Sequence, residues 1–137
     1  MSAASANIRI CYSELAPNGF VYYTHYTRWF EELQSSFLDS IGYPVSSLNK
    51  SGINFMPVDS YSKYYLPVSP LRETRAEMTI SDVTRVKVKI LYTLYSGGKK
   101  AAESEVTYAC LNDSLKPVIL SKDQSELYKI LLENVGK

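Results

Sequence analysis

Between residues 22 and 41, apolar residues recur at intervals of three and four positions. These positions, which would share one face of a helix, are Tyr22, Tyr26, Trp29, Phe30, Leu33, Phe37 and Ile41. Polar residues fill most of the positions between them, so the pattern predicts one long amphipathic helix that starts at residue 21 or 22. Gly42 and Pro44 follow, and both residue types commonly end a helix. About 20 residues would make a helix about 30 Å long.

Four segments after this helix have the alternation and composition of β-strands. The clearest is at residues 85–95, where one face would carry Val86, Val88, Ile90 and Tyr92 and the other Arg85, Lys87 and Lys89. The other three are expected at residues 53–66, 73–80 and 101–111. Ser-Gly-Gly-Lys at residues 96–99 is typical of a hairpin turn between the last two strands.

One more strand is predicted before the helix, at residues 8–14. The Pro-Asn-Gly sequence at residues 17–19 ends it, because proline removes a backbone donor and Asn-Gly tolerates positive φ. Near the end of the chain, residues 121–124 have the form of a capping box, which predicts a short helix to residue 131 or 132.

The order of these elements predicts an α+β fold with one long helix on a face of an antiparallel sheet. A chain of 137 residues fits one domain with a single core, so we expect residues 1–137 to form one unit.

The composition excludes several classes of function. The net charge of +1, with scattered lysines, argues against nucleic acid as a partner. No apolar run is long enough to span a membrane, and the first residues lack the features of a signal peptide, so we expect a cytoplasmic protein. Cys11 and Cys110 are expected to be reduced thiols, and they form no metal-binding pattern with the single histidine. We therefore expect no metal and no cofactor.

Twelve tyrosines are unusual in a chain of this length. They cluster at residues 22–26, 61–65 and 92–95. Tyrosine combines an apolar body with a polar tip, which suits the lining of a mostly apolar channel or a subunit interface. Ordinary packing on strands is an equally good interpretation of any single one.

Residues 12–42 carry the most informative motif. They resemble the hotdog-fold acyl thioesterases of the 4-hydroxybenzoyl-coenzyme A thioesterase type, in which the sequence reads roughly D-x-x-G-x-V-Y/W-Y/F-x-N-Y-x-R-W/F. The matching residues are Gly19, Val21, Tyr22, Tyr23, Tyr26, Arg28 and Trp29. Residues 109–118 also resemble the last strand of that family. The resemblance implies a hotdog fold, with active sites between the subunits of a homodimer or homotetramer.

The resemblance also implies how a thioester would be hydrolysed. In that family the N-terminus of the long helix directs free N–H groups at the thioester carbonyl, and these would be the amides of Tyr22 and Tyr23. Gly19 would allow close approach of the backbone. Asn18, Tyr26, Arg28 and Trp29 are the expected substrate-binding residues.

The motif departs from the family at one position, because Ala16 stands where the catalytic aspartate is expected. Three explanations are open. The protein is similar to the thioesterases of enediyne and polyketide pathways, which also lack that aspartate; or Ala16 is an engineered inactivating change; or the protein binds acyl groups without hydrolysing them.

Several side chains are candidates for the missing water-activating group. Histidine is the side-chain type that most often acts as an acid or base near neutral pH, and His25 lies close to the expected carbonyl site. Glu14 lies two residues before Ala16, so on a strand it would point the same way, although a solvated carboxylate is the plainer interpretation. Asn18 is a candidate for holding a water. We expect Glu31 and Glu32 to face solvent or a subunit boundary, and Asp59 to reach the site only across a dimer interface.

The sequence therefore favours a thioesterase that releases an acyl or polyketide chain from an acyl carrier protein or coenzyme A. A non-catalytic acyl-binding protein on the same fold is the main alternative. A hotdog dehydratase, which would pair His25 with an acid across a dimer, is a third.

Overall fold

The computed structural model of the protein describes residues 2–137. In chain order its elements are β1 (Ala4–Ile8), the short 3₁₀ helix η1 (Tyr12–Glu14), α1 (Thr24–Ser40), α2 (Val45–Lys50), β2 (Asn54–Tyr64), β3 (Thr74–Val83), β4 (Lys87–Ser96), β5 (Lys99–Leu111), α3 (Leu120–Asp123) and α4 (Ser125–Glu133). The long helix and the four strands after it lie within a few residues of their predicted positions.

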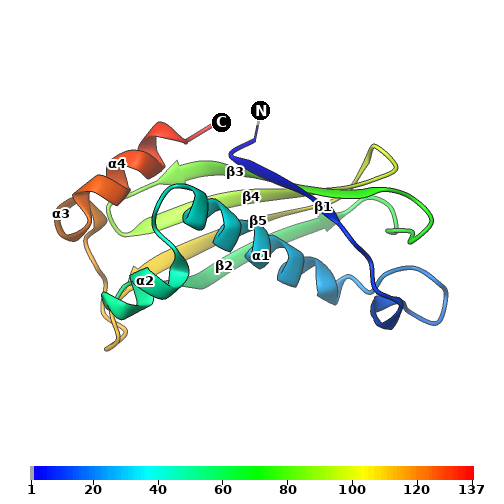
Figure 1. The fold of residues 1–137 in the computed structure, drawn as a ribbon, viewed down its shortest axis with the longest axis horizontal. Helices are drawn as coiled ribbons and strands as arrows, with labels where there is room; N and C mark the ends of the chain where they lie inside the picture. The colour runs from blue at the N-terminus through cyan, green and yellow to red at the C-terminus, as the bar shows by residue number, and fades with distance from the viewer. Residues whose placement is uncertain (1) are drawn as a thin grey trace.

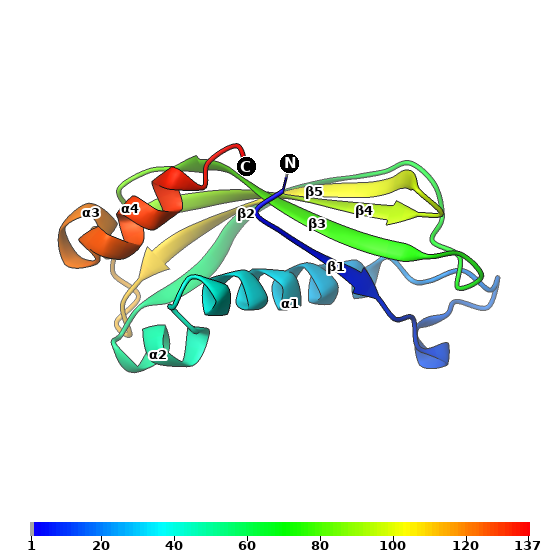
Figure 2. The ribbon, with the colours of Figure 1, turned by 45° about the horizontal axis from the view of Figure 1, so that its top comes forward.

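The strands form one antiparallel sheet in the order β1-β3-β4-β5-β2, and α1 runs along one face of it (Figures 1 and 2). The core lies between the sheet and α1. At its centre, Phe30 of α1 stacks on Tyr92 of β4 with the ring centroids 4.9 Å apart. The predicted α+β class and the predicted hotdog fold are both confirmed.

The segment before α1 differs from the prediction of a strand at residues 8–14. The first strand is Ala4–Ile8, paired with β3, and the chain then forms the 3₁₀ turn Tyr12–Glu14. A local side-chain contact favours this turn, because the Glu14 carboxylate accepts the Cys11 N–H at 2.7 Å. The prediction is therefore wrong for residues 9–14.

Three helical details also differ. The long helix begins at Thr24 and not at residue 21 or 22, because Val21 forms an isolated bridge with Leu15 and donates its N–H to the carbonyl of Val68. The segment after the long helix contains α2, which buries Leu48. Near the C-terminus, the helix predicted from residue 121 is divided at Gln124 into α3 and α4.

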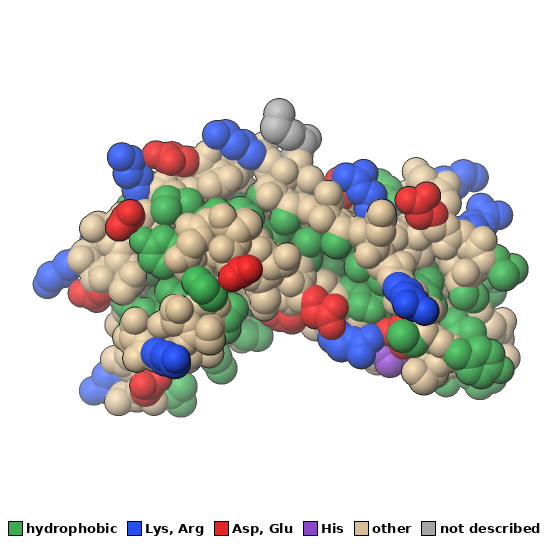
Figure 3. Space-filling model, viewed as in Figure 1, with side chains coloured by type: hydrophobic (Ala, Val, Ile, Leu, Met, Phe, Trp, Pro, Cys, Tyr) green, Lys and Arg blue, Asp and Glu red, His purple; other side chains and the backbone are tan. Residues whose placement is uncertain are grey.

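The β2 strand forms one edge of the sheet, and residues 56–64 are all exposed. Several large apolar side chains lie along this edge, namely Met56, Val58, Tyr61 and Tyr64. At the opposite edge, β1 and its neighbour β3 lie close to α1. Figure 3 shows hydrophobic side chains gathered at the end of the molecule where α1 begins, beside the histidine and a few charged groups.

Candidate active site

The turn that leads into α1 is closed by its own backbone hydrogen bonds. The Ala16 N–H donates to the carbonyl of Phe20 at 2.6 Å, and the Gly19 N–H donates to the carbonyl of Ala16 at 2.9 Å. Gly19 has φ of +87°, a conformation that strains other residues. A Cβ at this position would meet no atom within 4 Å. The glycine is therefore required by its backbone conformation and not by crowding.

A groove of about 580 Å³ lies beside this turn and the start of α1. We call it the helix-start groove; it is lined by Ala16, Asn18, Phe20, Val21, Tyr22, Tyr23, Tyr26, Tyr64, Tyr65, Leu66 and Pro67. None of these lining residues is a carboxylate or a histidine. The Asn18 side-chain oxygen accepts the Phe20 N–H at 3.0 Å, so it holds the turn.

Aromatic side chains from two distant segments form one wall of the groove. Tyr64 of β2 lies edge-on to Tyr23, with ring centroids 5.4 Å apart, and 6.2 Å from Tyr26. Tyr26 is only 6% exposed and stacks on Trp29. Burial raises the pKa of Tyr26 above its ordinary value. The fold thus brings together two of the tyrosine clusters seen in the sequence.

The free amides at the start of α1 lie one residue later than predicted. The Tyr22 N–H donates to the carbonyl of Glu14 at 3.1 Å, so it is already engaged. The N–H groups of His25 and Tyr26 donate to the carbonyls of Tyr22 and Tyr23. Within residues 2–137, the amides of Tyr23 and Thr24 have no acceptor. These two neighbouring donors carry the partial positive charge of the helix terminus.

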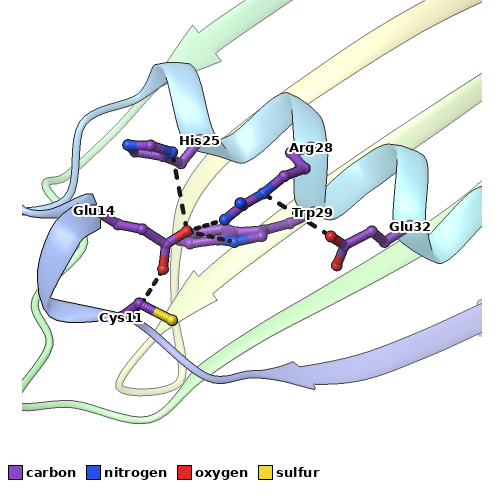
Figure 4. Close-up of polar contacts among 6 residues, drawn as sticks. All are labelled: Cys11, Glu14, His25, Arg28, Trp29 and Glu32. Atoms are coloured by element: carbon purple, nitrogen blue, oxygen red, sulfur yellow. Dashed lines mark hydrogen bonds and ion pairs between the residues drawn. The ribbon is translucent and has the colours of Figure 1, made fainter.

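Glu14 is the buried centre of a partly exposed polar cluster on another side of the helix start (Figure 4). Its carboxylate is 2% exposed; one oxygen accepts the Cys11 N–H, and the other accepts hydrogen bonds from Arg28 and from the Trp29 indole N–H at 3.2 Å. The Nδ1 atom of His25 lies 3.9 Å from that second oxygen. We call these five residues the Glu14 cluster.

The Glu14 cluster and the helix-start groove are separate places. Glu14, Arg28 and Trp29 line a different hollow of about 460 Å³, beside Arg9. The expectation that Glu14 points the same way as Ala16, or is solvated, is therefore wrong. The reason is that Glu14 belongs to a 3₁₀ turn and not to a strand, so side chains two residues apart no longer share a face.

Sequence reasoning missed the environment of Glu31. This residue is half-buried, and the Tyr108 hydroxyl donates to its carboxylate at 3.3 Å. The hydroxyls of Tyr108 and Tyr92 are 2.6 Å apart, so the three groups form a chain. Burial raises the pKa of Glu31, and the Tyr108 hydrogen bond offsets only part of that rise. The available signal in the sequence was the apolar Leu38, which comes seven residues after Glu31 and therefore lies on the same face of the helix.

Asp59 lies away from both places. It pairs with Thr107 across the strands, and with Lys87, Lys89 and Asp82 it lines a hollow on the outer face of the sheet. Asp59 is therefore not among the residues that line the helix-start groove of its own chain.

Comparison with known proteins identifies the family. Residues 12–126 match the model of the thioesterase-like superfamily. The chain belongs to this superfamily. It is 23% identical over 124 residues to YneP of Bacillus subtilis, whose name assigns it provisionally to the acyl-CoA thioesterases; the match covers 89% of this chain and 90% of YneP.

Two solved structures have the same fold as this superfamily member. The DHNA-CoA thioesterase of Staphylococcus aureus superposes with a TM-score of 0.87 at 18% identity, over 95% of this chain and 89% of that one. A hypothetical Staphylococcus aureus protein in complex with CoA superposes with a TM-score of 0.84 at 14% identity, over 100% of this chain and 89% of that one.

Two features of residues 2–137 bear on membranes and metals. No helix there is long and apolar enough to cross a membrane. No group of three or more His, Cys, Asp and Glu side chains in the described part of the chain is arranged to hold a metal ion.

Proposed function

We propose that this protein hydrolyses acyl-CoA thioesters in the helix-start groove. The observation that carries the proposal is the pair of unpaired amides at the start of the amphipathic helix, those of Tyr23, which lines the groove, and of Thr24, the next residue. Membership of the thioesterase-like superfamily supports it, as does the similarity to YneP, whose name refers to acyl-CoA.

In the proposed reaction, the thioester carbonyl oxygen lies against the amides of Tyr23 and Thr24. A water oxygen bonds to the acyl carbon, and the carbonyl electrons move to oxygen, where the two N–H groups and the helix dipole stabilise the charge. The C–S bond then breaks with its electron pair on sulfur, a proton from the water passes to that sulfur, and the products are a carboxylic acid and the CoA thiol. Removing one such donor typically costs about 10²–10³ in kcat.

The residues around the groove have distinct proposed roles. Tyr22, Tyr23 and Tyr26 contact the acyl chain, together with Tyr64 from β2. Asn18 and Gly19 keep the turn closed, so that the small Ala16 side chain leaves room beside the carbonyl. Glu14, Arg28, Trp29 and His25 belong to the cluster that fixes the turn against α1, and we assign them a positioning role.

The substrate and the assembly are also proposals. We favour CoA over an acyl carrier protein as the thiol, because the names of YneP and of the solved thioesterase refer to CoA esters. A polyketide acyl group stays a prediction from the absent aspartate at Ala16. We propose that β2, an exposed edge strand, pairs with a second copy to form at least a homodimer.

A pair of variants at Tyr23 tests the oxyanion donors. Tyr23→Pro removes the N–H, and the φ of −60° at this residue suits proline. Tyr23→Ala removes the same side chain and keeps the N–H. With benzoyl-CoA and octanoyl-CoA as substrates and thiol release as the signal, we expect Tyr23→Pro to be about 10²-fold slower than Tyr23→Ala. Equal rates in the two folded variants would refute the donor assignment, and no release by the wild type would refute the function.

One observation favours a second candidate, an acyl-binding protein without turnover. The residues that line the groove include no carboxylate and no histidine. Saturable binding of a non-hydrolysable acyl-CoA thioether, combined with no thiol release from the matching thioester, would support that function over hydrolysis.

A further inference from the structure

We propose that Lys63 and Lys100 bind the phosphate groups of the CoA substrate, at the place where the helix-start groove reaches the outer face of the sheet. This inference rests on the proposed function and extends that site to the charged part of the substrate. The residues that line the groove are all uncharged. CoA carries its negative charges on phosphates at the far end of an uncharged pantetheine arm. The groove alone therefore offers nothing that recognises that end.

The groove passes from the inner to the outer side of the sheet at the end of β2. Tyr64 points inward, where its ring contacts Tyr23 and Tyr26 near the start of α1. Tyr65 is the next residue, and its N–H still donates to the carbonyl of Ala101 as in a strand. Successive side chains of a strand point to opposite faces, so Tyr65 points outward. Both tyrosines line the groove, which therefore extends round this edge of the sheet.

Polar side chains gather where Tyr65 reaches the outer face. The Tyr65 hydroxyl donates to Glu103 at 2.5 Å, and the Lys100 ammonium donates to the same carboxylate at 3.3 Å. That ammonium also lies 5.7 Å from the centre of the Tyr65 ring. Lys63 lies directly opposite Glu103 across the two strands. We call Lys63, Tyr65, Lys100 and Glu103 the edge cluster.

The edge cluster contains one more cation than anions. The hydrogen bond from Tyr65 and the two nearby lysines lower the pKa of Glu103, so its carboxylate is ionised at neutral pH. Lys100 is paired with that carboxylate. The Lys63 ammonium lies 5.9 Å from the centre of the Tyr61 ring and forms no ion pair with a carboxylate of residues 2–137. The cluster therefore has a positive charge available to an anionic ligand.

Both lysines are accessible on the outer face. Lys63 and Lys100 are exposed, and they lie at the end of the molecule where α1 begins, as does the hairpin between β4 and β5 (Figures 1 and 2). A lysine carries its charge on a flexible stem, so it can reach a phosphate without a change in the backbone. Pairing of β2 with a second copy would use backbone groups in the plane of the sheet. Such pairing would leave these outward side chains free.

The pantetheine arm is long enough to join the two parts of the site. About 13 bonds separate its sulfur from the first phosphorus, and they span about 15 Å at full extension, by the geometry of an extended chain. The amides of Tyr23 and Thr24 lie on the inner side of the sheet and the edge cluster on the outer side. A sheet with its side chains is about 10 Å thick. The arm can therefore pass along Tyr64 and Tyr65 round the edge.

Phosphate contacts of this kind would act on substrate binding and not on the bond that breaks. The phosphates lie a whole pantetheine arm away from the acyl carbon, so their contacts are the same in the substrate complex and in the transition state. Loss of such contacts raises KM and leaves kcat unchanged. This signature distinguishes the edge cluster from the amides of Tyr23 and Thr24, whose loss lowers kcat.

Two thioesters of one acyl group test the phosphate assignment. Octanoyl-CoA carries the phosphates, and octanoyl-pantetheine lacks them. We expect Lys63→Gln and Lys100→Gln each to raise the KM for octanoyl-CoA about tenfold, as loss of one hydrogen bond to a charged group does. Neither change should alter kcat, or the KM for octanoyl-pantetheine. An unchanged KM for octanoyl-CoA in both variants, or an equal rise for both substrates, would overturn the assignment.

Lys89 provides a matched control on the same face of the sheet. Its ammonium lies 4.0 Å from Glu105, and its side chain is 42% exposed, compared with 47% for Lys100. Lys89 lines the hollow beside Asp59 and not the helix-start groove. We expect Lys89→Gln to leave both KM values unchanged. A larger rise for octanoyl-CoA in Lys89→Gln than in the edge-cluster variants would place the phosphates at that hollow and overturn the inference.

The salt dependence of KM gives a second readout. Dissolved ions screen the attraction between exposed charges, so the wild-type KM for octanoyl-CoA should rise with ionic strength. The rise should be smaller in the double variant Lys63→Gln/Lys100→Gln, and absent for octanoyl-pantetheine. The same salt dependence in the double variant as in the wild type would contradict the proposed contacts.

The outcomes separate this inference from the proposed function. A wild type that hydrolyses both thioesters with the same KM would keep the function and overturn the phosphate subsite. A wild type that hydrolyses neither would refute the function. Binding of the octyl-CoA thioether, measured by calorimetry, then still tests the lysines, because the Kd should rise about tenfold in each variant. An equal Kd in the wild type and both variants would overturn the subsite without any turnover.

Discussion

Two glutamates, one in the turn before α1 and one within α1, show how burial and hydrogen-bond partners give the same type of side chain different properties. Glu14, at the start of the helix, is buried and accepts hydrogen bonds from Cys11, Arg28 and Trp29. Glu31, two turns along, is half-buried and accepts one bond, from Tyr108. A buried carboxylate that is fully hydrogen-bonded to a cation is a rigid structural part. A carboxylate with one neutral donor and a raised pKa is poised to take a proton.

The Glu14 region also determines which amides are free. Its side chain ties the turn to the helix, and its carbonyl accepts the Tyr22 N–H. The first unpaired donors are consequently those of Tyr23 and Thr24. In this comparison Glu14 holds the turn against α1, whereas Glu31 keeps one carboxylate oxygen without a hydrogen-bond partner among residues 2–137.

The largest expected effect is on the stability of the Glu14 region. Glu14→Ala leaves the Arg28 guanidinium, the Trp29 indole N–H and the Cys11 N–H without their acceptor. We expect a loss of about 3 kcal/mol in the free energy of unfolding. Glu32→Ala, which removes only an exposed pair with Arg28, should change it by about 0.5 kcal/mol or less. Urea unfolding measures the free energy of unfolding of both variants. Equal losses would show that the hydrogen bonds to Glu14 do not stabilise the turn.

A smaller effect is expected for two glycines that share one conformation. Gly19 lies in the turn and Gly42 follows the end of α1; both have φ of +87° and open space around a Cβ. Gly19→Ala and Gly42→Ala should each cost about 1–2 kcal/mol. Only Gly19→Ala should also slow thiol release, because only this turn lines the groove. Equal slowing in both variants would mean that stability, and not the shape of the turn, controls the rate.

The smallest effect is a pH-dependent gain in stability at Glu31. Because the folded pKa is raised above its ordinary value of 4.5, the unfolded chain loses this proton first as pH rises. Wild-type stability therefore falls as pH rises from about 4.5 through the folded pKa, and the penalty is complete above it. We expect Glu31→Gln to melt slightly higher than the wild type at pH 7, with the difference vanishing near pH 4. A variant that melts lower at both pH values would contradict the raised pKa.

The sequence predicted the parts of the fold whose patterns are long and regular. The helical stripe from Tyr22 to Ile41 gave α1 apart from its first turn, and the alternation at residues 85–95 gave β4. The first strand was placed at residues 8–14, where a local contact between Glu14 and Cys11 outweighs strand propensity. The short helix α2 was missed, because its six residues bury only Leu48.

The sequence indicated which segment lines the groove, but it did not predict the environment of the individual charged side chains. Residues of the motif from Ala16 to Tyr26 do line one groove. Glu14 and Glu31 are both more buried than expected, since solvation was expected for the first and a position in solvent or at a subunit boundary for the second. Burial of a charged residue depends on partners from distant segments, and Tyr108 lies 77 residues from Glu31.

By itself, the sequence determined the layers of this protein, because periodicity of apolar residues is a local property that fixes which face of each element is buried. It also determined the turn at Gly19, since few residues adopt positive φ. Tertiary structure alone decided which amides stay free, which tyrosines meet, which carboxylate is held by a guanidinium and which accepts a single hydrogen bond. Those outcomes depend on hydrogen bonds and burial between segments far apart in the chain, which no local pattern encodes.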